Sequence, residues 1–220
     1  MNKVAIILIN YKDYAKKYLS DCLSSIRNQD FSGEIKLYIV DNETSEESFE
    51  YLKISAPEAE IIKNKNNDGF AKGNNDAIKL ALNEGFDYVL LLNMDTISEK
   101  NAVAEMVKMA GGSEWVGVVQ SRLMLWPNKE KINSLGNDTH FLGFGFCRGY
   151  NENYNPEITK DGVDIFYPSG AAVLFKSEVL KKIGLFDEDY FMYNEDQDLG
   201  WRVWLAGYKC VLAKNSVVYH

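Results

Sequence analysis

The chain is poor in the residues that build disulfide networks and zinc sites, with three cysteines and two histidines among its 220 residues. Cys22, Cys147 and Cys210 are odd in number, widely spaced and form no Cys-x-x-Cys pair, so neither a disulfide framework nor a structural zinc site is indicated. The apolar run that begins at Val4 is far shorter than the roughly 20 residues of a membrane span, and no signal-peptide cleavage site follows it. These absences predict a protein of the reducing cytoplasm.

Positive charge is also scarce, because 24 lysines and arginines face 32 aspartates and glutamates, for a net charge of −8. Binding nucleic acid through its phosphates requires a basic surface, so we expect no nucleic-acid partner. The sequence contains neither G-x-x-x-x-G-K-[ST] nor G-x-G-x-x-G, which excludes a P-loop and disfavours a dinucleotide-dependent redox enzyme. An anionic substrate must therefore bind locally, through backbone amides or a metal ion.

What the chain does contain is enough apolar material for one well-filled core, since 46% of its residues are hydrophobic and 13% are aromatic. No linker rich in proline or serine divides it, so we expect a single domain over residues 1–220. Within it, residues 1–95 are predicted to form a nucleotide-binding half and residues 96–220 an acceptor-binding half. Because His220 directly follows an apolar strand, we expect the sequence to be a piece of a longer protein.

In the first half, short apolar runs alternate with segments of helical spacing. The predicted strands are 4–9, 35–40, 59–62 and 88–92, and the predicted helices are 14–26, 48–54 and 71–82. Such alternation implies parallel strands joined by right-handed crossovers, hence an open α/β sheet.

The second half changes character. A helix is predicted over 97–110, begun by a capping box of Thr96 and Glu99. Shorter strands are predicted at 116–120, 122–126, 141–147 and 171–175, which extend the sheet with mixed or antiparallel pairing. The aromatic and glycine-rich segment 141–150 is either a platform for a sugar ring or an irregular hairpin.

Polar residues follow each predicted strand of the first half: Asn10-Tyr11, Asp41-Asn42, the turn 66–69 and Asn93-Met94-Asp95. Ligands of open α/β sheets bind beyond the carboxyl ends of the strands, so these residues are predicted to share a site. A single carboxylate such as Asp95, with phosphate oxygens and waters, is how Mg²⁺ or Mn²⁺ is usually held.

The other strand ends allow two interpretations each. Asp41 and Asn42 form either an Asx turn or a site whose carboxylate accepts N–H groups from a pyrimidine. In the second case Asn10 and Tyr11 supply backbone contacts and an aromatic wall. Residues 68–75 are either a loop before a glycine-rich helix start or a turn that holds ribose or phosphate oxygens.

The most unusual feature is segment 193–202, which places Glu195, Asp196 and Asp198 at the start of a helix directly after four large apolar or aromatic residues. One acid at a helix start gains about 0.3–1 kcal/mol, whereas three repel one another. Full solvation, a bound cation or a carboxylate kept near neutrality would explain them. Burial by the preceding residues favours a general base. His220 is either a metal ligand or, as a lone histidine, a structural residue.

Taken together, these blocks resemble the nucleotide-sugar glycosyltransferases of family 2, with the closest likeness to rhamnosyltransferase-like members that build surface polysaccharides. The blocks are residues 6–11, 40–42, 67–75, 91–95, 169–172 and 194–202. The resemblance implies the GT-A fold, a Rossmann-like, open, mixed and mostly parallel sheet flanked by helices, and an inverting reaction.

The resemblance also implies roles for individual residues. Asp196 would be the general base and Glu195 its neighbour in the acceptor pocket. Asp95 and His220 would hold a divalent cation, Mn²⁺ or Mg²⁺. The remaining nucleotide-sugar contacts would come from Asn10, Tyr11, Asp41, Asn42, Asp68, Gly69, Asn74 and Asn93. The chain departs from the family pattern at Asn93, which stands in place of the first acid of the metal motif.

The expected function is transfer of a sugar, with rhamnose among the candidates, from a UDP- or dTDP-sugar to a hydroxyl of a glycan or lipid-linked acceptor. The expected location is the cytoplasm or the inner face of the cell membrane. Two alternatives stay open. A sugar nucleotidyltransferase would share the nucleotide site and the metal, with Lys72 as its basic residue. A catalytically silent nucleotide-sugar binder would serve a polysaccharide assembly machine.

Overall fold

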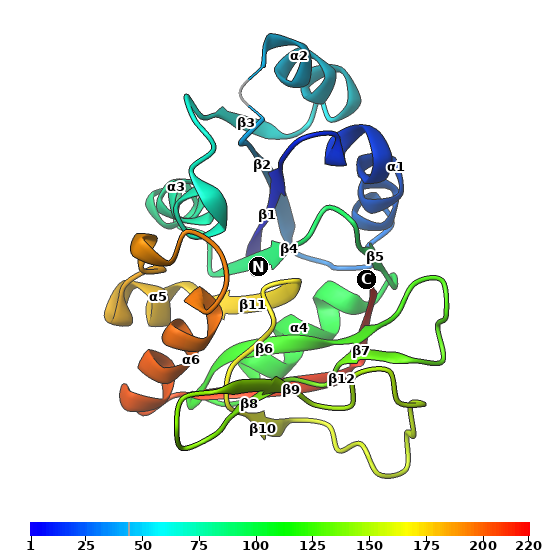
Figure 1. Ribbon diagram of the computed structural model, residues 1–220, viewed down its shortest axis with the longest axis vertical. Helices are drawn as coiled ribbons and strands as arrows, with labels where there is room; N and C mark the ends of the chain where they lie inside the picture. Colours follow the sequence, from blue (N-terminus) through cyan, green and yellow to red (C-terminus); the bar gives the residue numbers. More distant parts are fainter. Residues whose placement is uncertain (44) are drawn as a thin grey trace.

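In the computed structural model, which describes residues 1–43 and 45–220, one mixed sheet runs through both halves of the chain (Figure 1). Its strand order is β10-β12-β6-β11-β4-β1-β2-β3, with β5 pairing beside β12 and β7 beside β6. The sheet therefore crosses the boundary at residues 95–96. That the two halves bind donor and acceptor stays a prediction.

The first half forms the parallel part of the sheet, and its crossovers are helical. The strands are β1 (Lys3–Asn10), β2 (Glu34–Asp41), β3 (Glu60–Lys63) and β4 (Tyr88–Leu92), and the helices are α1 (Tyr14–Arg27), α2 (Glu46–Ser55) and α3 (Gly69–Asn83). β1 pairs in parallel with both β2 and β4. All five residues of β4 are buried, as expected for a strand covered on both faces.

The second half adds antiparallel pairs to this sheet. Its elements are β5 (Ile97–Ser98), α4 (Ala102–Gly111), β6 (Val116–Met124), β7 (Ile132–Ser134), β8 (Asn137–Thr139), β9 (Gly145–Cys147), β10 (Val163–Ile165), β11 (Ala172–Lys176), α5 (Ser177–Ile183), a 3₁₀ helix (Glu188–Tyr190), α6 (Glu195–Leu205) and β12 (Lys209–Tyr219). β11 runs antiparallel to β4 on one side and to β6 on the other, which joins the halves. β8 and β9 form a separate hairpin.

The sheet separates two apolar clusters, because successive side chains of a strand point to opposite faces. Ile6 lies in the cluster that contains residues of α1 and α4. Its neighbour Ile7 lies in the cluster that contains residues of α3, α5 and α6. Burial of each such side chain stabilises the fold by roughly 1.5–3 kcal/mol. Within residues 1–43 and 45–220, no helix combines the length and the apolar composition that crossing a bilayer takes.

The predicted helix 97–110 begins five residues late, so the prediction of its start is wrong. Ile97 and Ser98 instead pair antiparallel with the end of β12. Thr96 caps no helix, because its hydroxyl donates to the carbonyl of Asn93 at 2.6 Å, and Glu99 accepts a hydrogen bond from the Tyr219 hydroxyl at 2.9 Å. Pairing with a strand that is distant in sequence overrides the local capping pattern.

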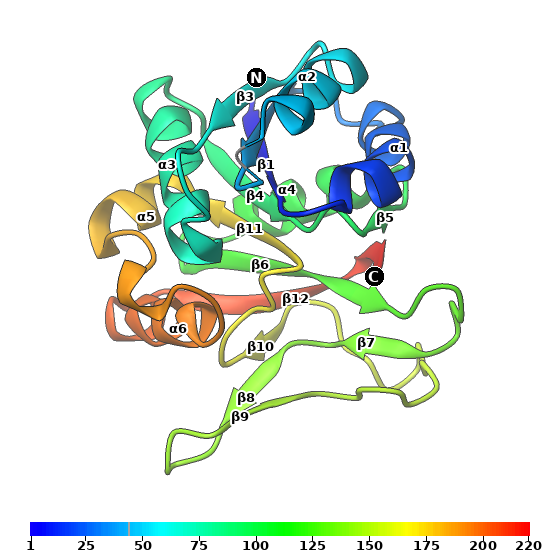
Figure 2. The same cartoon turned by 45° about the horizontal axis from the view of Figure 1, so that its top comes forward.

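Two strand predictions of the second half also change. Residues 122–124 continue β6 without a break from 116. Of the segment 141–147, only Gly145–Cys147 is a strand, and the preceding residues form the turn of the β8–β9 hairpin, which projects at the lower edge of Figure 2. Phe141 and Phe144 are 86% and 68% exposed, so their aromatic character does not mark a buried strand.

Candidate functional site

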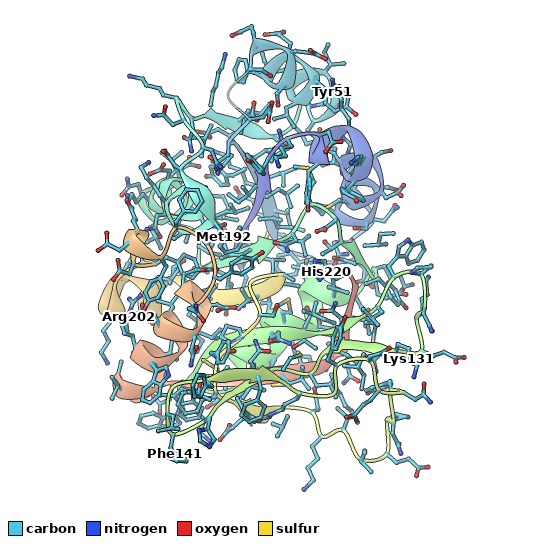
Figure 3. All side chains as sticks on the ribbon, viewed as in Figure 1. Tyr51, Lys131, Phe141, Met192, Arg202 and His220 are labelled. Carbon is cyan, nitrogen blue, oxygen red and sulfur yellow. The ribbon has the colours of Figure 1, made fainter. Side chains whose placement is uncertain are left out.

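The loops that carry the predicted site residues meet at the carboxyl edge of the sheet. The N–H of Asn93, just after β4, donates to the carbonyl of Ala171, just before β11, at 2.9 Å. The neighbouring N–H of Gly170 lies near enough to the carboxylate of Asp196 to lower its pKa. In Figure 3, Met192, which precedes α6, and His220, which ends the chain, both lie in the central band of the molecule. The loop before β11 thus links the β4 edge to the start of α6.

Asp41 lies at the end of β2 and is completely buried. One carboxylate oxygen, Oδ1, accepts hydrogen bonds from Asn10 Nδ2 at 2.8 Å and from Ser48 Oγ at 2.9 Å. The other, Oδ2, is buried and has no hydrogen-bond partner in the described part of the chain. Because an unpaired buried carboxylate oxygen is costly, this oxygen is suited to accept an N–H group of a ligand. Sequence reasoning missed Ser48, which holds Asp41 from the first turn of α2.

Three asparagines predicted to bind the donor use their side chains inside the protein instead. Asn10 accepts the N–H of Ala15 at 3.0 Å, in addition to its bond to Asp41. Asn42 donates to the carbonyl of Gly69 at 2.9 Å. Asn74 donates to the carbonyl of Phe70, one turn earlier in α3, at 2.9 Å. Since each is at most 2% exposed, these side chains shape the site loops, and any direct ligand contact from them stays a prediction.

The start of α3 packs against the segment that precedes α6. The carbonyl oxygen of Phe191 accepts the N–H groups of Phe70 at 2.8 Å and of Ala71 at 3.1 Å. These N–H groups are therefore already engaged and do not point freely at phosphate oxygens. Gly69 has a φ of +74°, and a Cβ there would lie 2.5 Å from the same carbonyl oxygen. A glycine is required at this close approach.

Asp68 and Lys72 form an ion pair at the same loop, with a carboxylate-to-Nζ distance of 3.0 Å. Lys72 also contacts Asp76 at 2.6 Å. The hydrogen bonds to Asp76 and then to Asp68 raise the pKa of Lys72 above its usual value. This lysine is thus neutralised by two carboxylates. Tyr11, just after β1, is 39% exposed, and Lys12 Nζ lies 5.1 Å from the centroid of its ring.

The segment before α6 has a strained backbone. Phe191, Tyr193 and Asn194 have φ values of 56°, 75° and 70°, in the left-handed region. Each such non-glycine residue costs about 1–3 kcal/mol, and strain of this kind concentrates at functional sites. Here it sets the direction in which α6 begins, and so the direction of the carboxylates of Glu195 and Asp196.

The three acids of α6 have separate environments, although the sequence groups them. Burial, followed by the charge of Asp196, raises the pKa of Glu195 to about 7, and its Oε2 has no partner within the described chain. Burial raises the pKa of Asp196 to about 6, against the opposing effect of the Gln197 and Gly170 N–H groups. Asp198 instead forms an ion pair with Arg202, one turn later, at 2.6 Å. Only the first two acids are suited to proton transfer near neutral pH.

At the end of β4, Asp95 lies beside His220. Asp95 Oδ1 and His220 Nε2 are 3.4 Å apart, and Asn93 Nδ2 lies 3.4 Å from the same ring nitrogen. Burial favours a higher pKa for Asp95, but the hydrogen bond and charge of His220 outweigh it and lower the pKa. The structure thus brings together the two residues that the sequence analysis assigned to a metal.

The donor atoms of Asp95 and His220 fit a divalent cation. Two ligands about 2.1 Å from an octahedral ion lie about 3 Å apart when they are adjacent, so a separation of 3.4 Å needs only a small adjustment. Among residues 1–43 and 45–220, no group of three or more histidine, cysteine or acidic side chains gathers in this way. Further ligands would have to come from substrate oxygens and water, which is usual for Mg²⁺.

The β8–β9 hairpin is attached to the start of α6. Gln197 Nε2 donates to the carbonyl of Gly143 at 2.9 Å and to Thr139 Oγ1 at 3.1 Å. Burial, followed by the charge of Asp196, raises the pKa of Tyr167 to about 12, and Tyr167 lies directly under Gly145. Figure 3 shows Phe141 at the outer end of this hairpin. Sequence reasoning missed Gln197 and Tyr167, and no local pattern marks them.

A cavity of about 340 Å³ opens beside the Asp41 network, with Lys12, Ser48 and Tyr51 among its lining residues. A second, of about 380 Å³, lies at the opposite end of the strands and includes Tyr88 and Lys176. The first shares Ser48 with Asp41 and so adjoins the predicted nucleotide end of the site. The carboxylates of Asp95 and Asp196 lie outside both cavities.

Solved structures with a similar fold include glycosyltransferases. Staphylococcus aureus TarS aligns over 99% of this chain and 36% of its own, with a TM-score of 0.72 and 16% identity. GalNAc-T7, solved with UDP, GalNAc and Mn²⁺, aligns over all of this chain and 44% of its own, with a TM-score of 0.78 and 13% identity. At these identities the likeness establishes the GT-A fold alone, and it confirms the predicted fold class.

Curated relatives are similar in sequence. The low-salt glycan biosynthesis hexosyltransferase Agl10 of Haloferax volcanii is 24% identical over 210 residues, which are 92% of this chain and 62% of the relative. An N-acetylglucosaminyl-diphospho-decaprenol L-rhamnosyltransferase of Mycobacterium tuberculosis is 42% identical over 52 residues, 24% of this chain and 17% of the relative. The chain thus spans less than two thirds of these relatives. The family model described as glycosyltransferase like family 2 matches residues 2–220, and the chain belongs to that family.

Proposed function

We propose that this chain is the catalytic domain of an inverting glycosyltransferase, which moves a sugar from a nucleoside diphosphate donor to a hydroxyl of a glycan or lipid-linked acceptor. The observation that carries the proposal is that the surroundings of two carboxylates in this region shift their pKa values in opposite directions. The pKa of Asp95 is lowered beside His220, whereas burial raises the pKa of Asp196 to about 6. Pairs of acids whose environments separate their pKa values mark a division of chemical roles.

On the donor side, Asp41 would recognise the nucleobase. Its free oxygen, Oδ2, is buried and accepts no hydrogen bond within the described residues, and Ser48 and Asn10 fix its partner oxygen. Uracil and thymine carry an N3–H group that such an oxygen accepts, whereas cytosine does not. Tyr11 would cover the base with its exposed ring. This chemistry favours UDP- or dTDP-sugars over CDP-sugars as donors.

The donor diphosphate would lie toward Asp95 and His220. A divalent cation held by these two side chains would neutralise the negative charge that develops on the leaving diphosphate. The chain is itself acidic, with a net charge of −8, so a local positive charge is needed there. The role of Asn93 would be to orient the imidazole of His220, which its amide contacts at 3.4 Å.

On the acceptor side, Asp196 would act as the general base. Its carboxylate would take the proton of the acceptor hydroxyl while the hydroxyl oxygen bonds to the anomeric carbon and the bond to the diphosphate breaks. A single displacement from the opposite face inverts the anomeric centre. Base catalysis of this kind contributes roughly 10²–10⁴-fold. Glu195, with a pKa of about 7, would hydrogen-bond the same acceptor sugar.

The acceptor class follows from the relatives by analogy. The mycobacterial relative is named for a sugar linked through diphosphate to a polyprenol, and the Haloferax relative is named for glycan biosynthesis. We therefore propose a lipid-linked glycan precursor as acceptor and the cytoplasmic membrane face as the place of reaction. The two carboxylates of Asp68 and Asp76 on Lys72 disfavour a sugar nucleotidyltransferase, which would need that cation for a triphosphate.

Thermal shift with UDP, dTDP and GDP, each with and without Mn²⁺, tests the donor assignment. A ligand at about 100 times its dissociation constant stabilises a protein by about 2.7 kcal/mol. We expect stabilisation by UDP or dTDP that Mn²⁺ enhances, and slow hydrolysis of the matching nucleotide sugar. Binding without any hydrolysis or transfer would favour the silent binder, and binding of none of these nucleotides would contradict the proposal.

A further inference from the structure

Arg122, on β6, is set apart from the other arginines by its lack of an acidic partner. Arg27, Arg148 and Arg202 each make paired hydrogen bonds to one carboxylate, those of Glu58, Asp138 and Asp198 respectively. In the described part of the chain, Arg122 has no ion pair with any acid.

An aromatic ring holds this guanidinium in place. The Cζ of Arg122 lies 4.0 Å from the centroid of the Tyr154 ring. Its Nε is buried and has no hydrogen-bond partner among the described residues. A cation–π contact uses the flat face of the guanidinium, so the N–H groups at its edge stay free for a planar pair of hydrogen bonds to an oxyanion. The side chain is therefore positioned for an anion that the chain itself does not supply.

A second cation is held in the same manner nearby. Lys129 Nζ lies 4.4 Å from the centroid of the Tyr219 ring and 4.9 Å from that of Trp126. These two rings pack edge to face, with centroids 6.2 Å apart. No acidic side chain of residues 1–43 or 45–220 pairs with Lys129. We call Arg122, Lys129 and the three aromatic side chains that hold them the cation patch.

The cation patch adjoins the proposed reaction site. Trp126 donates its N–H to the carbonyl of His220 at 3.1 Å, so the patch begins beside the predicted metal ligand. Gln120 precedes Arg122 by two residues, which places both on one face of β6 about 7 Å apart. The Gln120 side chain accepts the N–H of Ser169 at 2.7 Å, and the N–H of the next residue, Gly170, lowers the pKa of Asp196. Figure 1 shows β6, β7 and the end of β12 side by side in this region.

We infer that Arg122 and Lys129 bind a phosphate or diphosphate ester carried by the acceptor, while the acceptor sugar lies at Asp196. The inference rests on the proposed function and names the part of the acceptor that this face recognises. A net charge of −8 would repel an anionic acceptor, and two cations without acidic partners beside the site offset that repulsion locally. Arginine binds phosphate through two parallel hydrogen bonds, and lysine binds it as a point charge.

Binding of geranyl diphosphate in the presence of saturating UDP and Mg²⁺ tests the inference, because UDP then occupies the donor's own diphosphate position. Arg122→Gln is compared with Arg27→Gln, which removes the same charge from a distant ion pair. Loss of a charged hydrogen bond predicts about ten- to a hundredfold weaker binding for Arg122→Gln and no change for Arg27→Gln. Arg122→Lys keeps the positive charge but lacks the planar pair of N–H donors. Its affinity for geranyl diphosphate should lie between those of the unmodified protein and Arg122→Gln. Geraniol, which lacks phosphate, should not bind.

Unchanged affinity in Arg122→Gln, or equal binding of geraniol, would overturn the inference. If Arg122→Gln does not fold, Lys129→Gln gives the same comparison, with a smaller expected loss. Vesicles containing phosphatidylglycerol separate the two phosphate sources. Loss of vesicle binding without loss of geranyl diphosphate binding would assign the patch to a membrane surface instead and overturn the inference. A protein that binds geranyl diphosphate through Arg122 but transfers no sugar would contradict the proposed function alone.

Discussion

The two ends of the site are built in different ways. At the Asp41 end, regular parallel strands and buried asparagines hold one carboxylate rigidly, with its partner oxygen fixed by Asn10 and Ser48. At the Asp196 end, a strained segment with positive φ at Phe191 and Tyr193 aims a helix start that an exposed hairpin covers. If the proposed function is correct, the nucleotide would meet a preformed scaffold at the Asp41 end, whereas the acceptor would meet segments whose position depends on tertiary contacts.

The largest effect should come from the acceptor side. Asp196→Asn removes the proposed base but keeps its size and an oxygen that accepts the Gln197 N–H, so we expect sugar transfer to fall by about 10²–10⁴-fold. UDP binding by thermal shift should be unchanged. The matched control is Asp198→Asn, which removes the same charge from an ion pair with Arg202. Equal losses in both variants would show that the charge of the helix start matters and would refute a specific base.

The donor side is tested by Asp41→Asn. Because this change removes a charged acceptor for the N3–H of uracil, UDP affinity measured by calorimetry should fall about ten- to a hundredfold. CDP, which has no N3–H, should bind the unmodified protein more weakly than UDP. The variant should lose most of this discrimination. Ser48→Ala, which loosens only the other carboxylate oxygen, should have a smaller effect. If Asp41→Asn still prefers UDP over CDP as strongly as the unmodified protein does, Asp41 does not recognise the base.

Acidic residues at the two ends of the site should also differ in how they affect the free energy of unfolding. Burial raises the pKa of Glu195 from its ordinary 4.5 to about 7, so the folded state binds a proton more readily than the unfolded chain. This contribution stabilises the fold below pH 4.5 and is lost as pH rises to about 7. Glu195→Gln should therefore be more stable than the unmodified protein at pH 8, by at most about 3 kcal/mol, and equal to it at pH 4.

Urea unfolding at both pH values measures this difference. Glu47→Gln is the control, because Glu47 lies on the exposed donor-side helix α2 and pairs with Lys16. It should show no such gain at high pH. A Glu195→Gln variant that is less stable than the unmodified protein at pH 8 would mean that the carboxylate is well solvated or paired in solution.

The smallest effect is expected at the link between the β8–β9 hairpin and α6, which we expect to contribute to acceptor binding. Gln197→Ala removes the hydrogen bonds to Gly143 and Thr139, so the KM for acceptor should rise several-fold while donor hydrolysis stays unchanged. Steady-state kinetics with donor and acceptor varied separately measure the two effects. An equal change in both reactions would indicate that Gln197 supports α6 as a whole and not the hairpin.

The same contrast explains what the sequence could predict. β4 was predicted over its observed length, because an apolar run between turns indicates a strand buried on both faces. The strand ends that carry Asn10, Asp41 and Asp95 followed from the alternation of strands and helices. The position of Asp95 after a buried strand predicts a metal ligand, the resemblance adds His220 beside it, and the two side chains lie 3.4 Å apart.

The acceptor side resisted prediction because long-range pairing decides its structure. Ile97 was predicted to begin a helix, yet it pairs with β12, more than a hundred residues later in the chain. The capping pattern of Thr96 and Glu99 carries no information about that partner. Nor does any local spacing reveal that Gln197 reaches the hairpin or that Arg122 lacks an acid. These contacts depend on which surfaces meet after folding, so the periodicity of the sequence does not predict them.

The proposed function depends most on Asp196, which has a pKa raised to about 6 by burial and would accept the acceptor's proton. The dependence of kcat/KM for acceptor on pH tests it most directly, because this ratio reports the ionisation of the free enzyme. We expect a tenfold rise in the rate per pH unit below about pH 6 and a level rate above about pH 7. A rate that does not change between pH 5 and pH 7 would contradict it.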